Sequence, residues 1–168
     1  MKRMKLPPFG KLLILVSLAD SALLMSPALR AQNGAPSVHL KKLDIDCVIP
    51  GTAVSMGPGT CTGDLVGNAQ IVDVATFGTA LGNTDQGQVC FLEASTDTLT
   101  TNDGSTIVFT TTGMTCFGGG INTRNNAYQI TNGTGRFAGV GGAGTFVVAP
   151  SSASTFAVHI SGNIQFQN

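Results

Sequence analysis

The sequence has no tryptophan, a single tyrosine, and no segment with the apolar periodicity of an amphipathic helix. A helical bundle or a doubly wound α/β fold needs several such segments, so both architectures are excluded. What remains is rich in glycine, threonine, serine, valine and asparagine, with short stretches in which apolar and polar residues alternate. This pattern predicts a single all-β domain.

The first 31 residues resemble a secretory signal peptide. A basic start precedes the apolar run Leu12–Ala19, and cleavage is expected after Ala31, with Ala28 as the alternative. A retained membrane anchor is the competing reading, but Leu12–Leu29 barely spans about 30 Å of hydrocarbon and Asp20 interrupts it. We therefore expect a secreted or periplasmic protein with a flexible lead-in over 32–38, a domain over 39–168, and no stable membrane insertion after cleavage.

Positive charge is scarce beyond residue 31. Four bases face eight acids there, which gives a net charge of −4. A nucleic-acid or anionic-membrane surface needs clustered bases, and these four are scattered. Neither partner is expected, and the sequence does not indicate an oligomeric state.

Recognisable catalytic motifs are also missing. The segment Gly139–Gly144 formally matches G-x-G-x-x-G, but a dinucleotide site needs a following helix and an acid about 20 residues later. Here a β pattern follows, and no Asp or Glu occurs after Asp103. There is no G-x-S-x-G, H-E-x-x-H or Walker sequence either. We predict no cofactor.

The four cysteines contain no C-x-x-C pair, which argues against a zinc site, so no metal is expected. An even number of cysteines in an exported chain predicts two disulfides, with three connectivities open. We favour Cys47–Cys61, which would close a segment rich in turn signals, and Cys90–Cys116, which would join neighbouring strands.

Strands are expected over 40–49, 64–80, 88–94, 106–110, 128–132, 145–148 and 155–166. Asn102-Asp103-Gly104 predicts a hairpin turn, and Asn132-Gly133 supplies two residues suited to a tight turn. The glycines that follow indicate a sharply bent strand. The segment Phe117–Asn126, with three consecutive glycines, is interpreted as a mobile loop.

The stretch Tyr128–Val148 carries a family resemblance. It resembles the glycine-rich signature of the allene oxide cyclase and dirigent families, roughly Tyr-x-Ile-Thr-Gly-Gly-Thr-Gly-x-Phe-x-Gly-Ala-x-Gly. Asn132 and Val140 depart from the pattern, and Ser161–Ile164 is a weaker echo of it. The matching positions are Tyr128, Ile130, Thr131, Gly133, Thr134, Gly135, Phe137, Gly139 and Gly142. The resemblance implies an antiparallel barrel of about eight strands around a cavity, and it implies no catalytic residue.

Two residues are weak candidates for acid/base chemistry. Glu93, the only glutamate, flanks an apolar segment; if it points into a cavity, desolvation would raise its pKa. An exposed strand glutamate is the commoner case. His159 lies opposite the apolar face of the last strand, so an outward position is favoured over a cavity proton shuttle. Asp44 and Asp46 share one face of the first strand, and we interpret them as the solvated face of an edge strand.

Three functions follow as hypotheses. The first is an exported barrel that binds a small apolar molecule in its cavity. The second is a cofactor-free isomerase or cyclase acting on a lipid or phenolic intermediate, as the resemblance implies. The third is a structural or surface-interaction protein with a filled interior. The discriminating observation is whether acidic groups and His159 converge inside an apolar interior.

Overall fold

The computed structural model describes residues 38–52, 55–118 and 121–167. The expected signal peptide and nearly all of the expected lead-in lie outside these residues. Within the described residues, no helix is long and apolar enough to cross a membrane.

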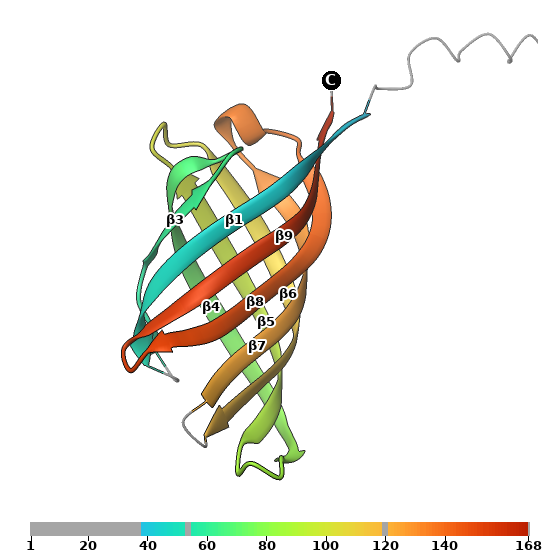
Figure 1. Ribbon diagram of the computed structural model, residues 1–168. Coiled ribbons are helices and arrows are strands. Elements are labelled where there is room, and N and C mark those ends of the chain that lie inside the picture. The colour runs from blue at the N-terminus through green and yellow to red at the C-terminus, as the bar shows by residue number, and fades with distance from the viewer. Residues whose placement is uncertain (1–37, 53–54, 119–120, 168) are drawn as a thin grey trace, which may run out of the picture. The chain divides into compact units, whose positions relative to one another are not determined.

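Eight antiparallel strands form one sheet that closes in a ring (Figure 1). Neighbours in sequence are neighbours in the sheet, and β9 pairs with β1 to complete the ring. A further two-residue strand, β2 (Ser55–Met56), pairs with the end of β1. The eight strands are β1 (Val38–Thr52), β3 (Gly59–Gly63), β4 (Gly67–Asn83), β5 (Val89–Thr101), β6 (Thr106–Gly118), β7 (Ile121–Gly133), β8 (Gly141–Ser152) and β9 (Thr155–Gln167). The all-β, antiparallel prediction is confirmed.

The alternation of apolar and polar residues along the sequence determines which side chains point into the closed sheet. In β5, buried and exposed residues alternate from Glu93 to Leu99, as expected for a strand with one face enclosed. The turn between β5 and β6 uses the predicted Asn-Asp-Gly sequence. Gly104 has a φ of 79°, and the Asp103 carboxylate accepts a hydrogen bond from the Ser105 backbone N–H at 3.1 Å.

An apolar core fills much of the enclosed space. β1 contributes Leu43, Ile45 and Ile49, which are each at most 1% exposed, and β9 contributes Val158, Ile160 and Ile164. Phe137, from the short 3-10 helix η2 (Gly135–Phe137), belongs to the same cluster. Burying side chains of this size contributes roughly 1.5–3 kcal/mol each.

The glycine-rich stretch serves the packing of the only tyrosine. Tyr128 lies directly opposite Gly144, which in turn lies opposite Gly162. A Cβ on Gly144 would lie 2.8 Å from Tyr128 Cε1, and one on Gly162 would lie 2.5 Å from the Tyr128 hydroxyl. Both glycines therefore leave the room that the tyrosine occupies.

Three details of the sequence interpretation are wrong. Asn132 and Gly133 do not form a tight turn: both belong to β7, and the connection to β8 runs through η2, with positive φ at Gly135 and Gly139 instead. The segment 117–126 is not a long loop, because β6 continues to Gly118 and β7 begins at Ile121. β1 is not an edge strand, since β9 pairs with it from Val38 to Pro50.

Two disulfides join directly opposed residues of neighbouring strands. Cys47 of β1 is bonded to Cys61 of β3, and Cys90 of β5 is bonded to Cys116 of β6. These are the predicted pairs. Each restricts the unfolded chain, which typically stabilises a protein by about 2–4 kcal/mol.

The packing of Tyr128 predicts an asymmetric response to added methyl groups. Gly144→Ala places a Cβ against the Ser161 carbonyl oxygen and 2.7 Å from Gly162 Cα, which are backbone atoms that cannot rotate away. Overpacking of this kind costs about 1–3 kcal/mol or more. The matched control is Gly141→Ala, because a Cβ there meets nothing within 4 Å. Urea unfolding should show a lower midpoint for Gly144→Ala only, and equal midpoints would contradict the packing described.

Candidate functional site

On part of the inner face of four adjacent strands, β4 to β7, polar side chains take the place of apolar ones. They form a group, here called the buried polar cluster, in which every side chain is almost completely removed from solvent. Buried polar groups are stable only where they find partners. The members are Asp73 of β4, Glu93, Ser95 and Asp97 of β5, Thr111 and Thr115 of β6, and Arg124 and Asn126 of β7.

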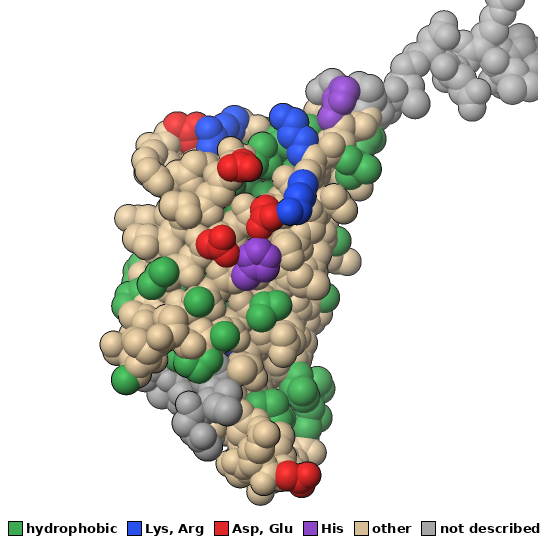
Figure 2. All heavy atoms as spheres, in the orientation of Figure 1, with side chains coloured by type: hydrophobic (Ala, Val, Ile, Leu, Met, Phe, Trp, Pro, Cys, Tyr) green, Lys and Arg blue, Asp and Glu red, His purple; other side chains and the backbone are tan. Residues whose placement is uncertain are grey.

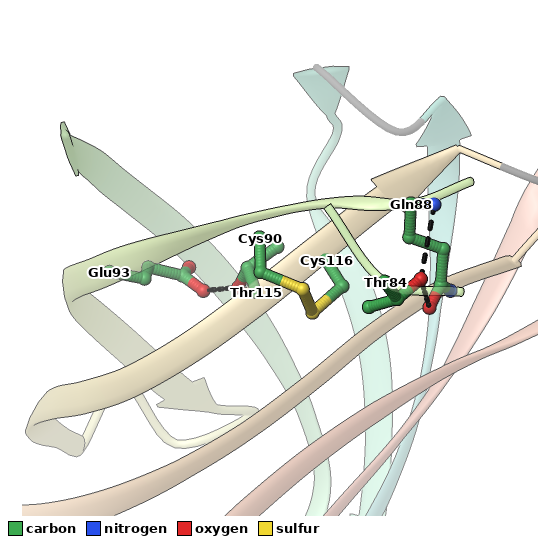
Figure 3. Close-up of a disulfide and its surroundings, with 6 residues drawn as sticks. All are labelled: Thr84, Gln88, Cys90, Glu93, Thr115 and Cys116. Carbon is green, nitrogen blue, oxygen red and sulfur yellow. Dashed lines mark hydrogen bonds between the residues drawn. A yellow bond between two sulfur atoms is a disulfide. The ribbon is translucent and has the colours of Figure 1, made fainter. Parts of the chain in front are cut away.

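Arg124 is the single base of this cluster. Its Nη1 atom lies 2.7 Å from Asp73 Oδ2 and 2.7 Å from Glu93 Oε1, so one guanidinium joins strands β4, β5 and β7. The contact with Asp73 is a hydrogen bond, whereas Glu93 Oε1 pairs without making one. The other oxygen of Glu93 accepts a hydrogen bond from the Thr115 hydroxyl, close to the Cys90–Cys116 disulfide (Figure 3).

A chain of hydroxyl groups surrounds the second aspartate. The Ser95 hydroxyl lies 2.8 Å from Asp97 Oδ2 and 2.6 Å from the Thr111 hydroxyl. The Asn126 amide donates to Thr111 at 3.4 Å. The Asp97 side chain is therefore held from one side, while its other oxygen faces β4.

Asp73 and Asp97 lie directly opposite each other on β4 and β5. With both carboxyls ionised, Asp73 Oδ1 and Asp97 Oδ1 have no hydrogen-bond donor. A proton on Asp97 supplies one, since the protonated carboxyl can bond to Asp73. The arrangement thus favours one shared proton, as expected for two close carboxylates.

Burial raises the pKa of Asp97 to about 8, and the negative charge of Asp73 adds to the shift. Burial also raises the pKa of Glu93, against the opposing effects of Arg124 and of a hydrogen bond from Asn126. The cluster therefore contains a carboxyl group that is protonated at neutral pH beside others that face a guanidinium. Carboxyl groups whose pKa values are separated in this way can donate and accept protons.

Three phenylalanines pack together beside the cluster. Phe77 lies opposite Glu93, and Phe91 lies opposite Thr115, so both share the inner face. The rings of Phe77, Phe91 and Phe117 have centroids 5.3–6.4 Å apart, and the Arg124 guanidinium lies 5.8 Å from the Phe77 ring. Phe77 is 42% exposed, so this aromatic triad extends from the side of the buried polar cluster to solvent.

The structure separates the two candidates that the sequence named. Glu93 lies inside the closed sheet, with a side chain that is 0% exposed. His159 lies outside, where its Nδ1 atom is 2.9 Å from Asp46 Oδ1 and its Nε2 atom is 3.8 Å from Asp44 Oδ1. Figure 2 shows acidic, basic and histidine side chains together on this outer surface. His159 and Glu93 therefore do not share a site.

Sequence reasoning missed the partners of Glu93. Asp73, Asp97 and Arg124 were counted as charges and not recognised as site residues. The signal that could have found them is the phase of the alternation: Glu93, Ser95 and Asp97 share the phase of buried Leu99 in β5. Polar residues in the phase of a buried face are a stronger indication of function than an isolated glutamate.

An apolar hollow of about 410 Å³ also occurs on the outer surface, where β3, β1, β9 and β8 adjoin. Val48, Ala149 and Ala157 are among its lining residues. It lies on the opposite face of the sheet from the inward side chains. Among the described residues, no group of three or more His, Cys, Asp or Glu side chains is arranged to hold a metal ion.

Comparison with models of known protein families, with curated proteins and with solved structures finds no match to this chain.

The raised pKa of Asp97 predicts how stability depends on pH. The folded protein holds a proton on Asp97 up to about pH 8, whereas the unfolded chain releases it near the ordinary value of 3.8. Between these values the folded state binds more protons, so the free energy of unfolding falls as pH rises, by at most about 1.4 kcal/mol per pH unit from this group.

Asp97→Asn removes this proton without removing the side chain, so its melting temperature should fall less steeply than that of the wild type between pH 5 and 8. At pH 9 the variant should be the more stable of the two. Asp64→Asn, in an exposed position, is the matched control and should keep the wild-type slope. Equal falls in melting temperature with pH for wild type and Asp97→Asn would show that Asp97 is not protonated in the folded state.

Proposed function

We propose that the protein binds a small molecule inside the closed sheet, with the buried polar cluster holding the polar group of the ligand and the aromatic triad forming the entry. The observation that carries this proposal is the number of buried polar atoms without a hydrogen-bond partner. Native proteins leave few such atoms. Here Glu93 Oε1, Arg124 Nε and Asn126 Oδ1 fall within one cluster, and Asp73 Oδ1 and Asp97 Oδ1 have no partner except the proton that the two carboxyls share.

The surroundings of the cluster suggest an amphipathic ligand in place of the wholly apolar one expected from sequence. Ligand sites combine apolar walls with a few placed polar groups. Arg124 and Asn126 lie opposite Val148 and Phe146 of β8, which are buried, and the aromatic triad adds three apolar faces. A ligand bound here would contact apolar side chains and place its polar group against β4 to β7.

The fold supports a related proposal about the type of barrel to which this sheet belongs. We propose that the closed sheet is a barrel of the allene oxide cyclase and dirigent type. The support is the combination of eight antiparallel strands in one closed sheet with the glycine-rich signature around Tyr128. Gly144 and Gly162 would then be retained for close packing of the tyrosine. A secreted or periplasmic location is proposed with it, and two disulfides accord with an oxidising compartment.

A cofactor-free isomerase or cyclase is the second candidate, and the Asp73–Asp97 pair favours it. A neutral carboxyl beside an ionised one can protonate a bound intermediate at one atom and remove a proton at another. Positioning in a closed interior would supply the rest of the rate enhancement. In that case Asp97→Asn should abolish turnover while leaving ligand binding measurable.

The binding proposal is tested by native mass spectrometry of the mature protein exported through an oxidising compartment. The wild type should carry an extra mass that is lost on denaturation, and the denatured mass should be four hydrogens below that of the reduced chain. Asn126→Leu changes the cluster without adding charge and should lose the extra mass. Val74→Ala, on the exposed face of β4, is the matched control and should keep it.

A second control distinguishes the interior from the outer hollow. Val48→Asp places a charge in the hollow and should leave the bound mass unchanged if the ligand lies inside. Binding lost in Val48→Asp but kept in Asn126→Leu would move the site to the outer surface. Absence of bound mass in the wild type, with ordered waters satisfying the cluster in a crystal structure, would contradict a binding function and favour a filled structural domain.

A further inference from the structure

The charges inside the closed sheet do not balance. Among the described buried residues, Asp73, Glu93 and Asp97 supply three carboxyl groups, whereas Arg124 supplies the only positive charge. The other bases of the described chain, Lys41, Lys42 and Arg136, are exposed. Buried charges are stable when they are paired, so a positively charged group is the partner that suits the opposed carboxyls of Asp73 and Asp97.

The unpaired atoms show what kind of group would supply that charge. With Asp97 ionised, four unpaired atoms of the cluster, Asp73 Oδ1, Glu93 Oε1, Asp97 Oδ1 and Asn126 Oδ1, are hydrogen-bond acceptors, whereas Arg124 Nε is the one unpaired donor within the cluster. Asn126 is 3% exposed and is not an acid, so its unpaired oxygen is evidence separate from the carboxylates. Acceptors therefore exceed donors, and the missing partner must be rich in donors. A primary ammonium has three donors and no acceptor.

The aromatic triad fits the same chemistry. Cations are attracted to the faces of aromatic rings, and such rings are used to recognise ammonium groups. Phe77 already lies 5.8 Å from the Arg124 guanidinium, so the triad tolerates a positive charge beside it. A ligand carboxylate, by contrast, would meet three carboxyl groups and would be repelled.

Resting on the proposed binding function, we infer that the ligand carries a primary ammonium group, and that this group replaces the proton shared by Asp73 and Asp97. Before binding, the proton joins the two carboxyls. As the ammonium enters, Asp97 releases that proton to solvent, both carboxylates accept hydrogen bonds from the ammonium, and no other bond is made or broken. The amine stays protonated throughout, because a primary alkylamine has a pKa of roughly 10.

The charged groups that act on Asp97 are Asp73 from β4 and Arg124 from β7, and the other buried ionisable side chains of β5 and β7 are Glu93 and Tyr128. Ser95 and Thr111 are neutral partners that do not titrate in the range of interest. Burial raises the pKa of Tyr128 to about 12, so it stays protonated between pH 6 and 9. In β1, β8 and β9 the inward side chains of the core cluster do not ionise, since the cysteine of β1 is in a disulfide. The exchange of one proton therefore belongs to the Asp73–Asp97 pair.

The test is isothermal titration calorimetry on the mature, disulfide-bonded protein with three probes of one shape: 2-phenylethylammonium, 2-phenylethanol and phenylacetate. The ammonium should bind at least about tenfold more tightly than the alcohol at pH 8.5, and phenylacetate should not bind. Affinity for the ammonium should rise about tenfold per pH unit between pH 6 and 7 and level off above pH 8, as one-proton competition requires. Titrations in two buffers of different ionisation enthalpy should show about one proton released at pH 6.5.

Asp97→Asn should remove both the preference for the ammonium and its pH dependence, and Asp64→Asn should change neither. Proton release by the wild type is measured without any variant, so the inference stays testable if Asp97→Asn does not fold. Equal binding of the alcohol and the ammonium, binding without proton release, or no ammonium binding at all would overturn it. If native mass spectrometry finds an interior ligand without an amine, the ammonium inference is wrong and the proposed binding function is kept. If it finds no interior ligand, both the inference and the proposed function are wrong.

Discussion

One guanidinium holds the polar interior together. Among the described side chains Arg124 is the only buried base, and the carboxylates of Asp73 and Glu93 both pair with it. Removing one partner from a buried ion pair commonly costs 3–5 kcal/mol, because the remaining charge is left without compensation. The position of Arg124 on β7 therefore fixes the register in which β4, β5 and β7 can meet around the cluster, since a shift by one residue would turn the charges outward.

Because Arg124 holds the polar side chains together, the interior is organised in two parts, one apolar and one polar. On β1, β8 and β9 the inward positions are apolar, and the packing of Tyr128 against Gly144 and Gly162 closes that side with little free space. On β4 to β7 the buried polar cluster occupies part of the inward face and is partly unpaired, while Ile71, Leu99 and Phe109 on the same strands are buried and apolar. An apolar core supplies most of the stability of a domain. The apolar half can thus tolerate a polar half that is arranged for a ligand and not for stability.

Much of the fold could be predicted from the sequence, because alternating apolar and polar residues indicate strands and an even number of cysteines indicates disulfides. The pairs Cys47–Cys61 and Cys90–Cys116 and the turn at Gly104 follow from local signals. The connection after Gly133 could not be predicted, since a 3-10 turn and a tight hairpin use the same residue types. The closing of the sheet by β1 and β9 depends on contacts between the two ends of the domain, which a local pattern does not encode.

The candidate site could be predicted only in part, for a similar reason. The alternation placed Glu93 on the face of Phe91, and the enclosed environment that raises its pKa comes from strands far along the chain. Asp73 and Arg124 are 51 positions apart, and nothing in the sequence joins them. His159 shows the converse: alternation put it opposite the apolar face, and it lies outside with Asp46.

The pairing of β1 with β9 also determines when the closed sheet can form. Thirteen backbone positions, from Val38 to Pro50, find their partners between Thr155 and Gln167. Contacts between segments so distant in sequence form slowly, because the loop they close is long. The ring therefore cannot close, and Arg124 and its carboxylates cannot be fully enclosed, before the last strand has been made. The hairpin pairings of β4 to β7 close shorter loops and need no contact with β9.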